Sequence, residues 1–225
     1  MKKFLSILAL ITAPILVAHA NPSYVQNGFY VTGALGYGYL FTPNNNQNAP
    51  TTQGSYSHGG LAGNIGGGYR WAMDSFTSLG LETDYLYNGK ATYHNNSTSY
   101  GNASYNGTST VSAQGLGLLA VFFTQWENGI NIFGKAGMAY IVQDQNYSSP
   151  AVVSGALVSG SQSEHGFQFI GVAGMGYLIT SNINLFMEGT YISGHSGGSW
   201  TTTDNKVNNN IVQNAQLSAG LSYYF

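Results

Sequence analysis

Apolar and polar residues alternate along most of the chain with a period of two, the spacing of β-strands that have one apolar face. In the stretch 58–72, Leu61 and Ile65 share one parity, and Asn64 and Arg70 share the other. The same pattern recurs in eight stretches of the sequence: 28–40, 58–72, 78–88, 110–124, 130–143, 165–179, 183–194 and 210–225. The pattern therefore predicts eight strands, each with an apolar face and a face of polar or small residues.

The connections between the predicted strands alternate in length. Short ones lie at 73–77, 125–129 and 180–182, and long ones at 41–57, 88–109, 144–164 and 195–209. Short turns on one side and long loops on the other are typical of transmembrane β-barrels. We predict an all-β fold: an eight-stranded antiparallel up-and-down transmembrane β-barrel with short periplasmic turns and four long extracellular loops. The alternative, a soluble β-sandwich, also has alternating strands but normally carries more charge.

Two of the predicted strands alternate less clearly than the others. The fourth has bulky apolar residues on both faces, but Gly115 and Gly117 indicate that its odd-numbered positions point inward. In the sixth, Met175 and Tyr177 are predicted to face lipid.

The first 20 residues have the layout of a secretory signal peptide: two lysines, an apolar run from Phe4 to Val17, and small residues that end at Ala20. A helical membrane anchor is the alternative, but the apolar run is shorter than the roughly 20 residues that a spanning helix needs. We predict cleavage near Ala20, which leaves 21–225 as a single β-barrel domain.

The composition of the chain favours a membrane protein over a soluble one. Charged residues make up 6% of the chain and hydrophobic residues 43%, whereas soluble domains carry about a quarter charged residues. Removal of the signal leaves four basic residues against eight acidic ones, a net charge of −4, which argues against nucleic acid as a partner. The sequence has no cysteine, and its histidines show no metal-ligand spacing, so no metal site and no cofactor are predicted.

The order and spacing of four short segments resemble the small outer-membrane β-barrels related to the transmembrane domain of outer membrane protein A and to the opacity-type surface proteins. These segments are LGLETDYLYNG (79–89), NIFGKAGMAY (131–140), GMGYLITSNINLFMEGTY (174–191) and LSYYF (221–225). The resemblance implies inward-pointing charges at Glu82, Lys135 and Glu188, and the parity of these positions also turns them inward. Phe186 departs from the pattern, because related barrels can carry a basic residue at this inward position.

The interior of an eight-stranded barrel is just wide enough for side chains to fill it. The parity of the strands predicts that five charged residues point there: Arg70, Glu82, Asp84, Lys135 and Glu188. Because an unpaired buried charge costs several kcal/mol, we expect these residues to pair as a charge network that fills the lumen. The alternative is a gate, in which rearrangement of the pairs opens a narrow water path.

The chain ends with apolar residues at alternating positions, Leu221, Tyr223 and Phe225. This pattern resembles the terminal aromatic signature by which outer-membrane barrels are recognised for assembly, which implies the barrel assembly machinery as a partner. The same residues are expected to face lipid.

One pair of residues suggests catalysis. His195 and Ser196 lie after the seventh predicted strand, and some similar barrels use a His and a Ser near this level to modify lipid A. Adjacent strand residues point to opposite faces, so this pair cannot share a proton unless the backbone turns there. We therefore predict that the protein is not an enzyme and has no catalytic residues.

The predicted loops are rich in Asn, Ser, Thr, Gly and Tyr and carry little charge. Such a composition suits surfaces that bind other molecules. We predict a monomeric, non-enzymatic outer-membrane surface protein of a Gram-negative bacterium, structural or adhesin-like through its extracellular loops. Its expected partners are outer-membrane lipid, lipopolysaccharide and host surface or matrix molecules. The alternatives are a narrow or gated pore and a lipid A-modifying enzyme.

Overall fold

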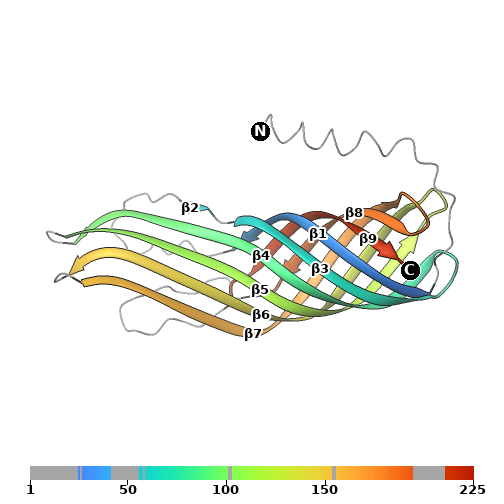
Figure 1. Cartoon of the computed structure of the whole chain (residues 1–225), viewed down its shortest axis with the longest axis horizontal. Helices are drawn as coiled ribbons and strands as arrows, with labels where there is room; N and C mark the ends of the chain where they lie inside the picture. Colours follow the sequence, from blue (N-terminus) through green and yellow to red (C-terminus); the bar gives the residue numbers. More distant parts are fainter. Residues whose placement is uncertain are drawn as a thin grey trace, which may run out of the picture.

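The computed structural model describes residues 25, 27–41, 56–57, 59–100, 103–153, 156–194 and 211–225. Its strands are β1 (Gly28–Leu40), β2 (Tyr56–Ser57), β3 (Gly59–Ala72), β4 (Thr77–Tyr100), β5 (Ala103–Gln125), β6 (Ile130–Val153), β7 (Ala156–Leu178), β8 (Ile183–Ile192) and β9 (Asn214–Tyr224). Eight of them form the wall of a barrel, and the two-residue β2 pairs with β4 (Figure 1). Within these residues, no helix has the length and apolar character needed to cross a membrane.

Every pair of neighbouring strands in the wall is antiparallel. The wall closes where β1 pairs with β9, from Tyr30↔Tyr224 to Leu40↔Asn214. Closure gives each wall strand two partners, so backbone hydrogen-bonding groups are satisfied within the wall, as a hydrocarbon environment requires. The predicted eight-stranded antiparallel barrel is therefore confirmed.

Each strand presents one face to the lumen and the other to the outside. On β6, Met138 is exposed and Lys135 is buried. On β5, Leu118 is 60% exposed and Leu119 is 0% exposed, which confirms that the odd-numbered positions of this strand point inward. Met175 of β7 is exposed, as predicted.

Large apolar side chains are exposed on the outer face of all eight wall strands. Aromatic residues border this apolar surface, with Trp126 and Phe225 at one end. Tyr85 lies toward the other end, where its Oη donates a hydrogen bond to Gln114 Oε1 (2.7 Å). An apolar surface with aromatic borders is typical of the lipid-facing side of a transmembrane barrel.

Three short turns lie at one end of the barrel, called the short-turn end below. In the β3–β4 turn, Asp74 Oδ1 accepts hydrogen bonds from the amides of Phe76 (2.7 Å) and Thr77 (2.8 Å). These amides, the Phe76 amide foremost, lower the pKa of the Asp74 carboxyl from its usual value. Gly129 in the β5–β6 turn has a φ of +83°, a conformation that favours glycine. Thr180 Oγ1 accepts backbone hydrogen bonds in the β7–β8 turn.

The opposite end of the barrel differs from the expectation. We expected long loops at 88–109 and 144–164, but the strands continue through most of both segments. β4, β5, β6 and β7 have 24, 23, 24 and 23 residues, whereas β1, β8 and β9 have 13, 10 and 11. Figure 1 shows the four long strands extending together beyond the rest of the wall.

The residues of this extension are 93–100, 103–109, 145–153 and 156–168, and together they are called the β4–β7 flap. They form a four-stranded sheet, in which Tyr93 pairs with Ser109, Ser109 with Tyr147, and Tyr147 with Gly160. The prediction was wrong because polar residues beyond the membrane no longer alternate with apolar ones, although backbone pairing between neighbouring strands continues.

The other two long loops predicted at this end, 41–57 and 195–209, lie largely outside the described residues. So does the predicted signal peptide, residues 1–20.

Candidate functional site

The centre of the lumen holds an ion cluster that joins three strands. Lys135 of β6 lies between a carboxylate of β4 and one of β8. Its Nζ is 2.5 Å from Glu82 Oε1 and 3.5 Å from Glu188 Oε2. The three side chains have exposed fractions of 5% or less. Inward parity places the residues at these positions, and the narrow barrel brings them within contact distance.

Two neutral side chains complete the coordination of the carboxylates. Tyr30 Oη of β1 donates to Glu82 Oε2 (2.6 Å), and Asn64 Nδ2 of β3 donates to Glu188 Oε1 (2.7 Å). The five residues are called the lumen charge cluster. They link five strands of the wall across its interior, so the cluster cross-braces the barrel.

Asp84 lies two residues after Glu82 and points inward like it. It is 1% exposed, and neither of its carboxylate oxygens has a hydrogen-bond donor among the described residues. It lies over Gly66 of β3, where any Cβ would collide with Asp84 Oδ1. Three buried carboxyl groups therefore share this level with one ammonium group, and Asp84 is the one that forms no ion pair with Lys135 and receives no hydrogen bond from a neutral donor among the described residues.

We expect Asp84→Asn to raise the free energy of unfolding by about 1–3 kcal/mol, because the substitution removes a carboxyl group whose ionised form the lumen solvates poorly and keeps the side-chain shape. Urea unfolding of the refolded protein in detergent micelles, followed by tryptophan fluorescence, measures the change. Asp144→Asn is the matched control at a half-buried position of β6, with an expected change within about 0.5 kcal/mol. A clear loss of stability in Asp84→Asn would contradict this view of the carboxylate.

Arg70 lies apart from the lumen charge cluster, toward the short-turn end. Its guanidinium carbon is 3.7 Å from the centre of the Tyr224 ring and 5.4 Å from that of Phe123. We expected all five inward charges to form one network. The structure joins Glu82, Lys135 and Glu188 by ion pairs and places the Arg70 guanidinium over aromatic rings.

Three residues of this interior were not predicted from the sequence. Tyr30, Asn64 and Tyr224 all contact charged groups there. Each lies on the inward parity of its strand, so this signal was available. Formal charge alone does not identify them, because neutral donors and ring faces also solvate buried ions.

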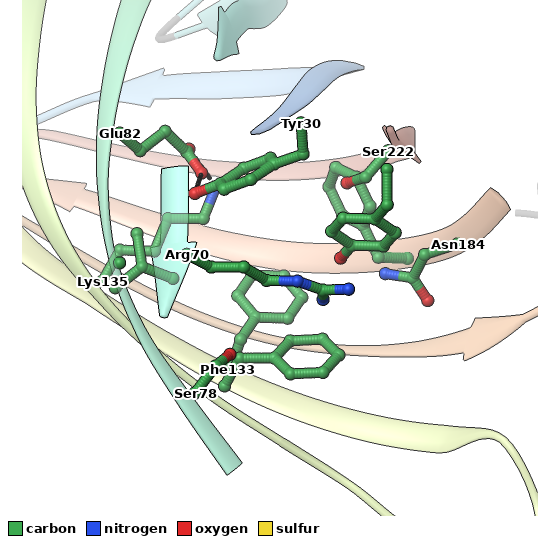
Figure 2. Close-up of a pocket in the computed structure, with 13 residues that line it drawn as sticks. Tyr30, Arg70, Ser78, Glu82, Phe133, Lys135, Asn184 and Ser222 are labelled. Atoms are coloured by element: carbon green, nitrogen blue, oxygen red, sulfur yellow. Dashed lines mark hydrogen bonds and ion pairs between the residues drawn. The ribbon is translucent and has the colours of Figure 1, made fainter. Parts of the chain in front are cut away.

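A small cavity lies between the lumen charge cluster and the short-turn end (Figure 2). Its volume is about 30 Å³, which is large enough for a water molecule or an ion of similar size. Arg70, Ser78, Asn184 and Tyr224 are among the residues that line it.

On the opposite side of the lumen charge cluster, toward the β4–β7 flap, apolar side chains fill the lumen. They include Leu86, Leu119, Ile141, Ile170, Ile192 and Ile211. A second group lies nearer the flap and consists of Leu40, Ala91, Val111 and Val212. The two groups are called the apolar seal. The amide of Val212, just before β9, donates to Gln143 Oε1 (2.9 Å) and so ties the segment that enters the lumen to β6.

Phe186 occupies the inward position at which related barrels can carry a basic residue. It is 2% exposed, and its ring centre lies 5.6 Å from that of Phe133 in an edge-to-face contact. An aromatic pair therefore fills this part of the lumen in place of a basic residue.

The residues of the predicted assembly signature lie on the outer face of β9 and just beyond it. Leu221, Tyr223 and Phe225 are all exposed, and the Tyr223 and Phe225 rings contact each other at 5.1 Å. Recognition by the assembly machinery stays a prediction. His195 and Ser196 lie outside the described residues.

Residues 6–225 match the model of the outer membrane protein beta-barrel domain family. Among solved structures, the chain is similar to Ail, the attachment invasion locus protein of Yersinia pestis, with 11% identity over 89% of this chain and 100% of that one and a TM-score of 0.46. It is also similar to the outer membrane protein OprG of Pseudomonas aeruginosa, with 12% identity over 92% and 99% of the two chains and a TM-score of 0.48.

A third similar structure is the outer membrane protease OmpT of Escherichia coli, with 11% identity over 90% of this chain and 98% of that one and a TM-score of 0.45. Among curated proteins, none matches the chain. The family match spans nearly the whole sequence, so the chain belongs to the outer membrane protein β-barrel family and is an outer-membrane protein.

Proposed function

We propose that this protein is a non-enzymatic surface protein that binds macromolecules outside the cell through the β4–β7 flap. The observation that carries the proposal is the difference in strand length: β4–β7 have 23 or 24 residues, whereas β1, β8 and β9 have 10 to 13. A transmembrane strand needs about 9–11 residues. The additional length has no use in crossing the membrane and raises a sheet above the surface.

Backbone pairing supports a defined binding surface in place of flexible loops. In the flap, β5 and β6 pair on both sides, with β4 and β7 as their outer neighbours. Among the described residues, β8 pairs with β7 only as far as Ile170, so 156–168 of β7 have one strand partner. An edge of this kind accepts an added strand, and backbone hydrogen bonds then supply affinity.

The composition of the flap supports binding by hydrogen bonds and aromatic contacts over binding by charge. The flap residues, 93–100, 103–109, 145–153 and 156–168, are rich in Asn, Ser, Thr and Tyr and have Glu164 as their one Lys, Arg, Asp or Glu residue. Such side chains adapt their hydrogen bonds to many partners. Host surface and matrix molecules are therefore the class of partner that we propose.

The filled lumen supports a surface role over a pore. Two buried apolar groups close it toward the flap, and the lumen charge cluster spans it below them. Water and ions gain nothing by entering a dry apolar constriction, so passage needs the apolar seal to move first.

The test is a variant in which both flap hairpins are shortened without changing the barrel. The register sets the cuts: Tyr93 is joined to Ser109 and Gln145 to Gln162 by tight Asn-Gly turns, because these residues are partners across the sheet. Both cuts lie beyond the β-bulge between Tyr87 and Lys90 of β4 and beyond the apolar seal, so these are kept. We expect saturable binding of the intact protein in nanodiscs to host cells or matrix proteins, with at least a tenfold loss in the shortened variant.

Two controls make the result specific. Variants with one hairpin shortened show which half of the flap binds, and resistance to unfolding in urea shows that each barrel is folded. Equal binding by the intact and the fully shortened protein would refute a role for the flap. Absence of binding by both would refute adhesion to the surfaces tested.

A further inference from the structure

Asp84 and Glu82 lie two residues apart on the inward face of β4, and their carboxyl groups meet in the lumen. Both side chains are buried, with exposed fractions of 1% and 2%. The two carboxyl groups are placed to form a side-chain hydrogen bond with each other. An ionised carboxylate has acceptor oxygens only, so two carboxylates cannot form such a bond. The contact therefore requires a proton on one of the two groups.

The partners of Glu82 are those of an ionised carboxylate. Lys135 Nζ lies 2.5 Å from Glu82 Oε1, and Tyr30 Oη donates a hydrogen bond to Glu82 Oε2 (2.6 Å; Figure 2). Asp84 receives no hydrogen bond from a donor among the described residues. An ionised Asp84 would therefore be buried without a donor, which is strongly unfavourable. The proton of the pair belongs on Asp84.

The other titratable groups around Asp84 do not offset a second negative charge. Apart from Glu82, they are Tyr30 of β1, Lys135 of β6 and Glu188 of β8. Lys135 and the two glutamates that it contacts already have a formal net charge of 1 − 2 = −1. An ionised Asp84 would lower this charge to −2 inside the barrel.

The remaining strands bring side chains without a titratable group to this level. Gly66 of β3 is the strand partner of Asp84, and the absence of a side chain there leaves room for the carboxyl group. The strand partners of Glu82, Lys135 and Glu188 on β5, β7 and β9 are Leu119, Val172 and Ser218. Arg70, also on β3, lies nearer the short-turn end, with its guanidinium over the Tyr224 ring.

We propose that Asp84 keeps a proton at neutral pH and donates it in a hydrogen bond to Glu82, so that this carboxyl pair is a pH-sensitive switch inside the barrel. When the proton leaves, two carboxylates lie side by side in the lumen and repel each other. The repulsion weakens the barrel at this level and favours the entry of water, which solvates the charges. The switch acts independently of binding by the flap.

The experiment measures the folding equilibrium constant by urea unfolding over a range of pH, for the unaltered protein and for Asp84→Asn. In the unfolded chain, an aspartate ionises around its ordinary pKa of about 3.9. Above this pH, unfolding of the unaltered protein releases the proton of Asp84. Its folding constant, divided by that of Asp84→Asn, is therefore expected to fall about tenfold per pH unit until the folded protein also loses the proton. The division cancels the titration of groups that both proteins share.

Asp74→Asn is a control with the opposite sign. Asp74 lies in the exposed β3–β4 turn, where the amide of Phe76 and then that of Thr77 lower the pKa of its carboxyl. Stability from a lowered pKa is present above the unfolded pKa and is lost as the pH falls through the folded one. The folding constant of the unaltered protein, divided by that of Asp74→Asn, is therefore expected to be level near neutral pH and to fall only in acid.

Infrared spectroscopy detects the proton directly, because the carbonyl of a neutral carboxyl group absorbs apart from a carboxylate. The unaltered protein is expected to show this absorption at neutral pH and to lose it in alkali, and Asp84→Asn is expected to lack it. A ratio of folding constants for Asp84→Asn that stays level from acid to alkali would overturn the proposal. A neutral-carboxyl absorption that persists in Asp84→Asn would place the proton elsewhere. If this variant does not refold, absence of the absorption from the unaltered protein still refutes the proposal.

Discussion

Replacing Lys135 with methionine is expected to lower the free energy of unfolding by about 3–5 kcal/mol. The substitution keeps an unbranched side chain of similar length but removes the ammonium group between Glu82 and Glu188. Both carboxylates are buried within the barrel, so each is left without its counterion in a medium that solvates charge poorly. Urea unfolding of the refolded protein in micelles measures the loss.

The same substitution at an exposed lysine is the control. Lys90→Met is expected to change the free energy of unfolding by no more than about 0.5 kcal/mol. Adding Glu82→Gln and Glu188→Gln to Lys135→Met should restore most of the stability, because the uncompensated charges are then gone. Equal stability of Lys135→Met and Lys90→Met would show that the ion cluster contributes nothing.

The second large effect is expected at Gly38 of β1, a buried inward position. A Cβ there would lie 2.6 Å from the carbonyl oxygen of Asn88 and 2.9 Å from Ala62 Cβ. Asn88 approaches because β4 has a bulge at this level, where Gly89 has a φ of +85° and Asn214 Nδ2 donates to the Asn88 carbonyl oxygen (3.1 Å). Gly38→Ala must displace backbone, so a loss of about 1–3 kcal/mol is expected.

Gly134 offers the matched comparison, because a Cβ added there meets nothing closer than the Val172 carbonyl oxygen at 3.9 Å. Gly134→Ala is expected to be neutral or stabilising by up to about 1 kcal/mol, since it restricts the unfolded chain without disturbing the folded one. The two substitutions are therefore expected to change the free energy of unfolding in opposite directions. Equal destabilisation at both positions would mean that the loss reflects the strand backbone and not the close approach of Asn88.

The strands of the barrel were predictable within the membrane, where contact with lipid requires apolar residues on one face of each strand. A membrane-spanning strand has one face in hydrocarbon, so a shift by one residue would bury or expose the wrong side chains. This constraint resolved even β5, where Leu118 and Leu119 differ only in parity and take opposite faces. Two glycines in that strand sufficed to assign the faces.

The flap and the position of Arg70 were not predictable in the same way. Outside the membrane, either face of a strand can be polar, so the sequence of 88–109 does not distinguish a loop from a paired strand. The parity of a position also shows only which face of the strand the residue lies on, and it does not show which residues it contacts. The partners of Arg70 depend on which rings, here Tyr224 and Phe123, lie at its level in the closed barrel.

The seam between β1 and β9 sets the order of events during folding. Ser222 Oγ donates a hydrogen bond to Thr32 Oγ1 (3.3 Å), although the two residues are 190 positions apart in the sequence. The other seams join wall strands that follow one another along the chain. Hairpins form early because their ends are already close, but this last contact must wait for the complete chain. Until then, β1 and β9 each carry an unpaired backbone edge that can capture another chain. A protein that covers these two edges until β9 pairs with β1 would therefore raise the yield of folded barrels.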